Sequence, residues 1–213
     1  MTEAELRLAM CDIGQRLYAR QLCAANDGNL SCRLDGDRIL CTPTLMCKGF
    51  LQPDDLCLVD YEGNQLTGKR SRTSEILLHL SVYRHRSDIQ AVVHCHAPHA
   101  SAFAVTRQPV PMGIMPEADV FLTHVPVAPY AAPGNQRFAD TILPYLPHTN
   151  VILLANHGVI SFGPDLERAY WLSEILDAYC RILILAKTLG TVVELSAEEQ
   201  QELAELKKVW MNP

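Results

Sequence analysis

Two histidines separated by a single residue stand at the end of an apolar run, where they could bind one metal ion together. His94 and His96 follow the run 89–93, which reads as a buried strand. Successive side chains of a strand point to opposite faces, so both imidazoles share one face and Cys95 takes the other. Burying two imidazoles on one face of a sheet is costly unless they share a ligand. The pair therefore predicts a metal site.

Two further side chains could complete the coordination of that ion. His157 follows a second apolar run, 151–155, and Glu75 opens a helical pattern shortly before the histidine pair. Each has an ordinary alternative, since single histidines are usually structural and an acid in the first turn of a helix interacts favourably with the helix dipole. Three histidines and one carboxylate are ligands that suit zinc or a similar divalent ion.

Three short motifs could bind an anion. The sequence Gly-Asn-Leu-Ser at 28–31 could cradle one with backbone and side-chain donors, although glycine and asparagine are equally typical of a plain turn. Thr73 and Ser74 stand at the predicted helix start, where two hydroxyls and free N–H groups would suit a phosphate. The alternative for them is simple capping of the helix. Thr-Pro-Thr at 42–44 is the third candidate.

The elements that would position these residues follow from the spacing of the apolar side chains. Helical spacing predicts helices over 3–22, 74–85, 98–105, 135–146, 165–189 and 197–209. Strands are predicted over 30–34, 38–42, 56–60, 89–93, 125–130, 150–155 and 158–162, with a hairpin turn at 35–37. Prolines make 125–130 an edge strand, and 110–124 shows no clear pattern.

This order of elements predicts an α/β fold in three layers. Helices lie at both ends of the chain and strands in the middle, some of them joined by tight hairpins, which is typical of an α/β/α sandwich. A doubly wound parallel sheet would need strands and helices to alternate throughout, so we expect a mixed, largely antiparallel sheet. We expect one domain over 1–213.

Composition narrows the class of protein further. The net charge of −6 argues against nucleic acid as a partner, and no apolar run approaches the roughly 20 residues that a membrane span needs. Residues 1–5 carry acids where a signal peptide carries bases and an apolar segment. Eight cysteines stand singly, as expected of reduced thiols. We therefore expect a cytoplasmic protein without nucleic-acid or membrane partners.

Taken in order, the motifs resemble the class II aldolase/adducin family along nearly the whole chain, from about residue 5 to 210. The resemblance is carried by Gly28-Asn29-Leu30-Ser31-Cys32-Arg33, Thr42-Pro43-Thr44, Thr73-Ser74-Glu75, His94-Cys95-His96 and Asn156-His157-Gly158. It implies that one zinc ion is bound by Glu75, His94, His96 and His157, and that Glu75 is also the catalytic acid/base. It implies that the substrate phosphate is held by Gly28, Asn29, Thr44, Thr73 and Ser74. It also implies the α/β/α sandwich and a homotetramer with active sites at subunit interfaces.

The resemblance implies a zinc-dependent carbon–carbon lyase. Such an aldolase cleaves a ketose phosphate of the L-fuculose 1-phosphate type into dihydroxyacetone phosphate and a short aldehyde such as lactaldehyde, through a metal-stabilised enediolate. The family also contains pentulose-phosphate 4-epimerases, methylthioribulose-phosphate dehydratases and sugar-acid phosphate decarboxylases, which stay open as alternatives. A non-enzymatic adducin-like scaffold is the remote alternative, and it should lack the metal ligands that this chain retains.

Two positions depart from the pattern of the family's aldolases. Those enzymes have a glycine after the threonine that matches Thr44, whereas this chain has Leu45 followed by extra residues up to Phe50. They also have a tyrosine, contributed by a neighbouring subunit, that protonates an intermediate. Met115 lies near the matching place, and Glu117 is the candidate replacement acid, with an ordinary loop carboxylate as the alternative.

Overall fold

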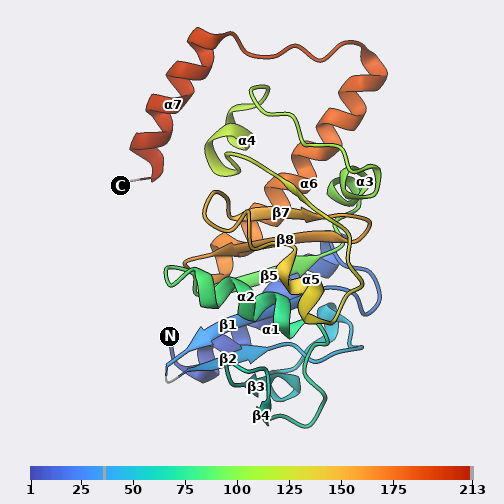
Figure 1. Cartoon of the computed structure of the whole chain (residues 1–213), viewed down its shortest axis with the longest axis vertical. Helices are drawn as coiled ribbons and strands as arrows, with labels where there is room; N and C mark the ends of the chain where they lie inside the picture. The colour runs from blue at the N-terminus through green and yellow to red at the C-terminus, as the bar shows by residue number, and fades with distance from the viewer. Residues whose placement is uncertain (36, 212–213) are drawn as a thin grey trace.

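A single mixed sheet forms the centre of the molecule (Figure 1). The computed structural model describes residues 1–35 and 37–211, and within them eight strands pair in the order β4-β3-β2-β1-β5-β8-β7-β6. They are β1 (Asn29–Leu34), β2 (Arg38–Cys41), β3 (Cys57–Val59), β4 (Gln65–Thr67), β5 (Ala91–Cys95), β6 (Val127–Ala128), β7 (Val151–Leu154) and β8 (Gly158–Gly163). Neighbouring strands are antiparallel apart from β6 and β7, which are parallel. The prediction of a mixed, largely antiparallel sheet is confirmed.

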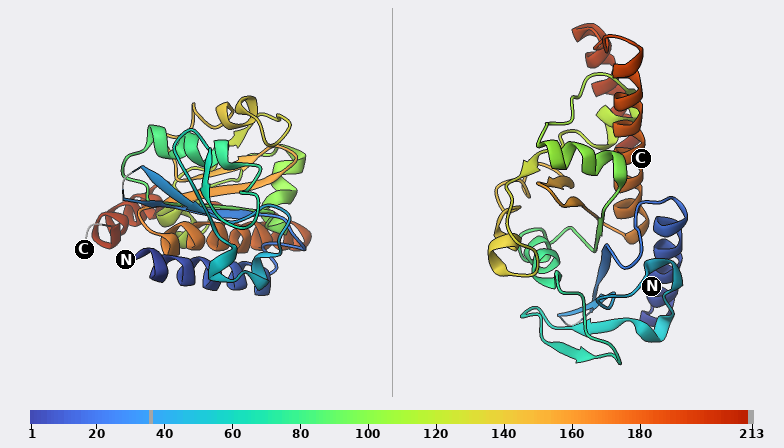
Figure 2. Two further views of the ribbon diagram at one scale, coloured as in Figure 1. Left: turned by 90° about the horizontal axis from the view of Figure 1, so that it is seen from below. Right: turned by 90° about the vertical axis from the view of Figure 1, so that its right-hand side faces the viewer.

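Helices cover both faces of this sheet. Figure 2 shows α1 (Glu3–Ala19) and α6 (Leu166–Leu189) below it, with α2 (Ile76–His85) and α5 (Gln136–Asp140) above. The side of α6 also carries α3 (Pro98–Thr106) and α4 (Pro116–Phe121), and α7 (Ala197–Met211) contacts α4. Two short 3₁₀ helices, η1 (Lys48–Phe50) and η2 (Pro53–Asp55), precede β3. This arrangement is the predicted α/β/α sandwich.

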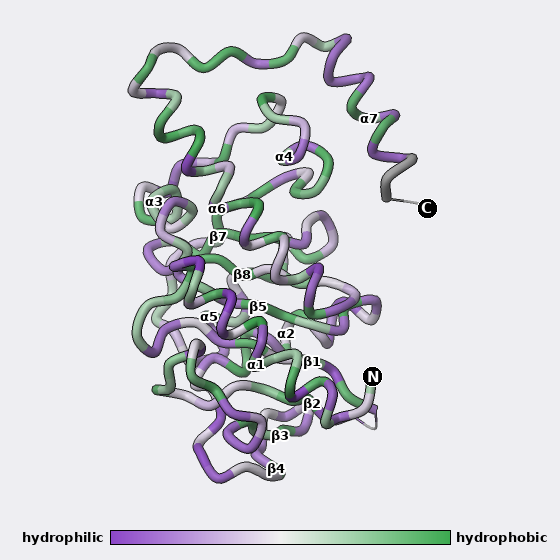
Figure 3. The backbone as a smooth tube through the Cα atoms, turned by 180° about the vertical axis from the view of Figure 1, so that it is seen from behind, coloured by the Kyte–Doolittle hydropathy of each residue, from purple (hydrophilic) through white to green (hydrophobic). Residues whose placement is uncertain are grey.

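The sheet separates two hydrophobic cores, and β5 contributes to both. Val93 and Cys95 pack toward α1 and α6, whereas Val92 packs toward α2 and α5. Because both faces are covered, the strand is apolar on both of them apart from His94, which joins Val92 on the side of α2. Figure 3 shows the central strands as mostly hydrophobic and the edge around β4 as hydrophilic. Among the described residues, no helix has the length and apolar character that crossing a membrane requires.

Several predicted bounds were wrong for identifiable reasons. The helix predicted over 135–146 ends at Asp140 and continues as turns to residue 148, because Pro144 has no N–H and disfavours helical backbone before it. The helix predicted to reach residue 22 ends at Ala19, and Gln21 has a left-handed φ of 60°. The strand predicted over 125–130 shrinks to β6, which does lie at the edge of the sheet.

Four short elements escaped sequence reasoning altogether. Helix α4 lies in the segment that showed no pattern, and it is too short to display a helical period. Strand β4 is exposed on every residue, so it has no alternation of polar and apolar side chains and depends on pairing with β3. The 3₁₀ helices η1 and η2 are likewise too short for a periodic signal.

Candidate metal centre and active-site pocket

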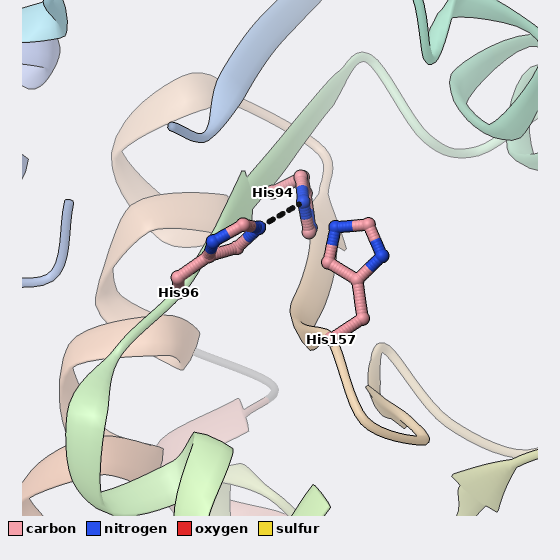
Figure 4. A group of neighbouring side chains, drawn as sticks. All are labelled: His94, His96 and His157. Carbon is pink, nitrogen blue, oxygen red and sulfur yellow. Dashed lines mark hydrogen bonds between the residues drawn. The ribbon is translucent and has the colours of Figure 1, made fainter. Parts of the chain in front are cut away.

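Three imidazoles converge where the ends of β5 and β8 meet (Figure 4). His94 is the fourth residue of β5, His96 follows the strand, and His157 faces them from the turn between β7 and β8. The Nε2 atoms of His94 and His96 lie 3.1 Å apart. One ring nitrogen from each of the three histidines can be chosen so that all lie within 4.8 Å of one another. Three nitrogens this close together fit a single ion as ligands.

Glu75 brings a carboxylate to the same point. Its Oε2 lies 3.2 Å from His94 Nε2, and its Oε1 lies 3.3 Å from His157 Nε2. Glu75 is the N-cap residue of α2 and is buried. The structure therefore brings together all four side chains expected to bind zinc. Three imidazoles and one carboxylate fit a divalent ion, since each can offer a lone pair without a competing proton.

Contacts around the histidines hold each ring in a fixed orientation. The Nδ1 of His94 lies 2.8 Å from the carbonyl oxygen of Val159, to which it can donate while Nε2 stays free as a ligand. The Nδ1 of His96 lies 3.4 Å from Asp27 Oδ2, and the ring of His157 stacks on Phe138. Burial lowers the pKa of His94 and of His157. Both rings are therefore neutral, which is the form that binds a metal.

The Asn-His-Gly motif has a clear steric basis. A side chain at Gly158 would place its Cβ 2.5 Å from the carbonyl oxygen of Cys95 and 2.8 Å from the ring of His96. Only glycine therefore allows the turn that carries His157 to approach the histidine pair this closely. Asn156 adopts a left-handed φ of 56°, which asparagine tolerates, and its side-chain oxygen accepts hydrogen bonds from Arg107.

A pocket of about 250 Å³ opens beside these ligands. All five residues expected to hold a phosphate line it, together with three of the metal-ligand candidates: Gly28, Asn29, Thr44, Thr73, Ser74, Glu75, His96 and His157. Backbone hydrogen bonds join the two hydroxyl-bearing segments, because Thr44 N–H donates to Ser71 O and Thr73 N–H donates to Thr42 O, each at 3.0 Å. Residues distant in sequence thus share one pocket wall.

The anion-binding candidates differ in what their side chains already contact. Gly28 has a φ of 71°, and a Cβ there would lie 2.9 Å from His94 O, so the position requires glycine. The Thr73 hydroxyl accepts a hydrogen bond from Glu75 N–H at 3.3 Å, which is the capping alternative, whereas Ser74 is exposed in the pocket. Asn29 donates its amide to Glu75 Oε2 at 2.8 Å. Ser74 is therefore the side chain that is best placed for an incoming anion.

Leu45, which stands where the family pattern has glycine, adopts a backbone conformation that glycine favours. Its φ is 55°, a left-handed value that costs a residue with a Cβ about 1–2 kcal/mol. The side chain is 81% exposed and lines the pocket. The departure at this position therefore leaves the loop in the shape that glycine favours and adds an exposed apolar side chain beside the pocket.

Glu117 does not join this pocket in its own chain. It lies exposed in α4, the helix that Met115 caps and that packs on α6 and α7. Among the described residues that line the pocket, neither Glu117 nor Met115 is present. A catalytic role for Glu117 therefore requires the α4 of a neighbouring subunit, and it stays a prediction.

Two charged residues of the pocket were missed by sequence reasoning. Asp27 lines it beside His96, and Lys48 lines it from the start of η1. No cluster of basic residues stands near the anion-binding motifs in the sequence, and a single lysine is not a cluster. The available signal was that Lys48 interrupts the otherwise uncharged run 43–53.

A buried chain of hydrogen bonds connects Glu75 to the interior of the sheet. Asn29 Nδ2 donates to Glu75 Oε2, so Asn29 Oδ1 accepts from His79 Nε2 at 2.5 Å. The Nδ1 of His79 must then accept from the Ser31 hydroxyl at 2.7 Å, and Ser31 accepts from Tyr83 at 2.8 Å. Every donor in the chain meets an acceptor. This arrangement fixes one carboxylate oxygen of Glu75 in place.

His79 should make the protein sensitive to acid. Burial lowers the pKa of His79 from 6.5 to about 3. The unfolded chain therefore binds a proton that the folded chain does not, and the free energy of unfolding falls by up to ~1.4 kcal/mol for each pH unit below 6.5 until about pH 3. In His79→Gln this acid-dependent loss of stability is absent. The difference in free energy of unfolding between the wild type and the variant should therefore narrow as the pH falls.

Urea unfolding at pH 7, 6 and 5 measures this effect. The matched control is His85→Gln, an exposed histidine of the same helix, which should retain the pH dependence of the wild type. Apart from the replaced histidine, the three proteins carry the same titratable groups. Parallel stability curves for the wild type and His79→Gln would contradict the prediction.

Comparison with known proteins identifies the family. Residues 8–184 match the family described as class II aldolase and adducin N-terminal domain, which covers most of the chain. A solved structure of L-fuculose 1-phosphate aldolase superposes with a TM-score of 0.88 at 29% identity, covering 98% of each chain. The protein therefore belongs to the class II aldolase/adducin family.

Curated relatives carry two different activities. An L-fuculose phosphate aldolase of Methanococcus maripaludis is 32% identical over 82% of this chain and 93% of its own length. A 3-oxo-tetronate 4-phosphate decarboxylase of Haemophilus influenzae is 33% identical over 85% of this chain and 88% of its own length. Both activities break a carbon–carbon bond, and this chain is an enzyme of that lyase class.

Proposed function

We propose that this protein is a zinc-dependent aldolase that cleaves a ketose 1-phosphate of the L-fuculose 1-phosphate type. The products would be dihydroxyacetone phosphate and a short aldehyde such as lactaldehyde. One observation carries the proposal: Glu75 lies within 3.3 Å of two of the three clustered histidines and lines the same pocket as the anion-binding candidates. The candidates for a metal site, an acid/base and a phosphate site thus line one pocket.

Different residues of the chain have different roles in such a cleavage. A divalent ion, when bound by His94, His96, His157 and Glu75, supplies a Lewis acid that stabilises negative charge on the substrate carbonyl oxygen. Ser74 and the neighbouring donors hold the phosphate and so fix the position of the sugar. As the bond between C3 and C4 breaks, the C4 hydroxyl gives its proton to a base and C4 becomes the carbonyl carbon of the aldehyde. Glu75 then passes a proton to C3 to complete dihydroxyacetone phosphate. Asn29 orients the carboxylate through its bond to Oε2.

A homotetramer with active sites between subunits is part of this proposal. The support comes from Glu117, which is an exposed carboxylate of α4 and lies outside the pocket of its own chain. The group that accepts the proton of the C4 hydroxyl during cleavage could then come from a neighbouring subunit. Light scattering of the purified protein measures the assembly, and a monomer with full activity would exclude a catalytic role for Glu117 across an interface.

A decarboxylase of a sugar-acid phosphate is the second candidate. The observation that favours it is the relative that acts as a 3-oxo-tetronate 4-phosphate decarboxylase, whose identity to this chain matches that of the aldolases. Loss of carbon dioxide from a 3-oxo acid and cleavage of a ketose phosphate both leave negative charge beside a carbonyl group. The same ligands and the same phosphate site would serve both reactions.

Two assays distinguish these candidates. L-Fuculose 1-phosphate is supplied with a dehydrogenase that reduces dihydroxyacetone phosphate, and 3-oxo-tetronate 4-phosphate is supplied while carbon dioxide is collected. We expect turnover of the ketose 1-phosphate with a higher kcat/KM than that of the acid. Turnover of the acid alone would overturn the aldolase proposal in favour of the decarboxylase.

Ser74→Ala should weaken the use of phosphorylated substrate selectively. A hydrogen bond to a charged group contributes about 1.5–3 kcal/mol, so kcat/KM for the ketose phosphate should fall about tenfold or more. The unphosphorylated ketose should be almost unaffected. Ser71→Ala, an exposed serine outside the pocket lining, serves as the matched control. Equal losses for both sugars would show that Ser74 shapes the site without holding the phosphate.

A further inference from the structure

Lys48 is a buried cation in the wall of the active-site pocket. The residue is 1% exposed and lines the pocket. Its Nζ donates to the carbonyl oxygen of Asn26 at 2.9 Å and to that of Met46. An ammonium group has three protons, so these two bonds leave one proton without a protein acceptor in the part of the chain that the structure describes.

No residue that the structure describes places a counter-ion in direct contact with the charge of Lys48. Within residues 1–35 and 37–211 no carboxylate forms an ion pair with its Nζ, and Asp27 and Glu75 act on it only through space. Burial of an ammonium without a paired anion is unfavourable, and it lowers the pKa of Lys48. A fold that keeps such a group beside an open pocket provides a place for an anion from outside the chain.

The position of the Lys48 ammonium matches that of the anion-binding motifs. One of its carbonyl partners, Asn26, precedes Gly28 and Asn29, and the other, Met46, follows Thr44. The ammonium therefore lies where the two loops meet, and both loops line the pocket. The exposed hydroxyl of Ser74 lines the same pocket from the segment that precedes α2. An anion held by these motifs would lie near the positive charge of Lys48.

We propose that the Lys48 ammonium is a specificity determinant that pairs with the phosphate dianion of the substrate. The pairing supplies the counter-charge that the described part of the chain does not place against Lys48. The inference rests on the proposed function in one respect, which is that the substrate is a sugar phosphate. The competing interpretation is that Lys48 only ties the two loops together through its bonds to Asn26 and Met46.

Binding of inorganic phosphate tests this pairing without any turnover. Calorimetric titration of the metal-loaded protein with inorganic phosphate should show an affinity that falls at least about tenfold in Lys48→Met. Lys48→Arg keeps the charge and should retain most of the affinity. Lys69→Met is the matched control, because Lys69 is an exposed lysine paired with Asp54 outside the pocket. Unchanged phosphate affinity in Lys48→Met would overturn the proposal.

A second measurement distinguishes pairing of the Lys48 charge with the phosphate from a purely structural role in joining the two loops. The kcat/KM values for L-fuculose 1-phosphate and for L-fuculose should diverge, with a loss of about tenfold for the phosphorylated sugar alone in Lys48→Met. Equal losses for both sugars would mean that Lys48 only ties the loops. Lys48→Gln keeps a side-chain donor for the carbonyl oxygen of Asn26 or Met46. It is used in both measurements if Lys48→Met does not fold. If L-fuculose 1-phosphate is not a substrate, the phosphate titration still decides the role of Lys48.

Discussion

Alanine in place of His96 should yield a folded protein that has lost both its metal ion and its activity. His96 lies just outside β5 and is partly exposed, so its removal leaves no cavity in the hydrophobic core. His94 is fully buried and bonded to Val159, which makes it a poorer position for this test. Without His96, one carboxylate and two imidazoles remain, and the set that suits a tightly bound divalent ion is broken.

Elemental analysis beside an activity assay measures the effect. The wild type should contain close to one zinc ion per chain, and His96→Ala should contain almost none and show no detectable turnover. His85→Ala is the control, since His85 is an exposed histidine of α2 whose ring bonds to Ser81 O, outside the pocket lining. Full activity in protein stripped of metal would contradict the proposed mechanism as a whole.

The parts of the fold that could be predicted from sequence are those whose apolar residues form a continuous run or a regular spacing. The continuous apolar run of β5 reflects burial on both faces, and the regular apolar spacing of α6 reflects packing of one face on the sheet. The short strand β4 and helix α4 have no such signal, because their conformations depend on neighbours that are distant in sequence. Strand β4 depends on pairing with β3, and helix α4 depends on packing on α6. Both contacts exist only in the folded chain.

The candidate site likewise contains residues that local sequence relates to one another and residues that only the folded chain brings together. His94 and His96 could be related to each other by the two-residue period of a strand, because both belong to one local segment. The expectation that Glu75 and His157 lie close to the histidine pair was implied by the family resemblance, because the local sequence does not determine their distance from the pair. Lys48 was not identified from the sequence, because the two loops that its side chain joins come together only in the folded chain.

The hydrogen bonds of the site also refine what the motifs imply. Asn29 belongs to the motif expected to hold a phosphate, yet its amide is bonded to Glu75 and to His79. Its replacement with alanine should therefore impair phosphorylated and unphosphorylated sugars alike, in contrast to Ser74→Ala. Sequence reasoning identified the residue, but the direction in which its amide points follows from tertiary contacts alone.

Glutamine in place of Glu75 should lower kcat by about 10²–10⁴-fold while much of the metal stays bound, because the variant loses a group that can carry a proton. Glutamine has the shape of glutamate and keeps an oxygen that can accept from Asn29, so the buried hydrogen-bond chain can persist. The three histidines remain as ligands, which explains why metal binding should suffer less than turnover.

The rate has to be expressed per bound metal ion, because Glu75 is expected to serve both as a ligand and as an acid/base. Measuring kcat together with metal content in Glu75→Gln separates the two roles. Glu62→Gln, an exposed glutamate in the turn before β4, is the matched control and should behave as the wild type. A fall in activity that merely follows the loss of metal would assign Glu75 to metal binding alone. An unchanged kcat in the metal-loaded variant would place the base elsewhere, with Asp27 as the remaining carboxylate of the pocket.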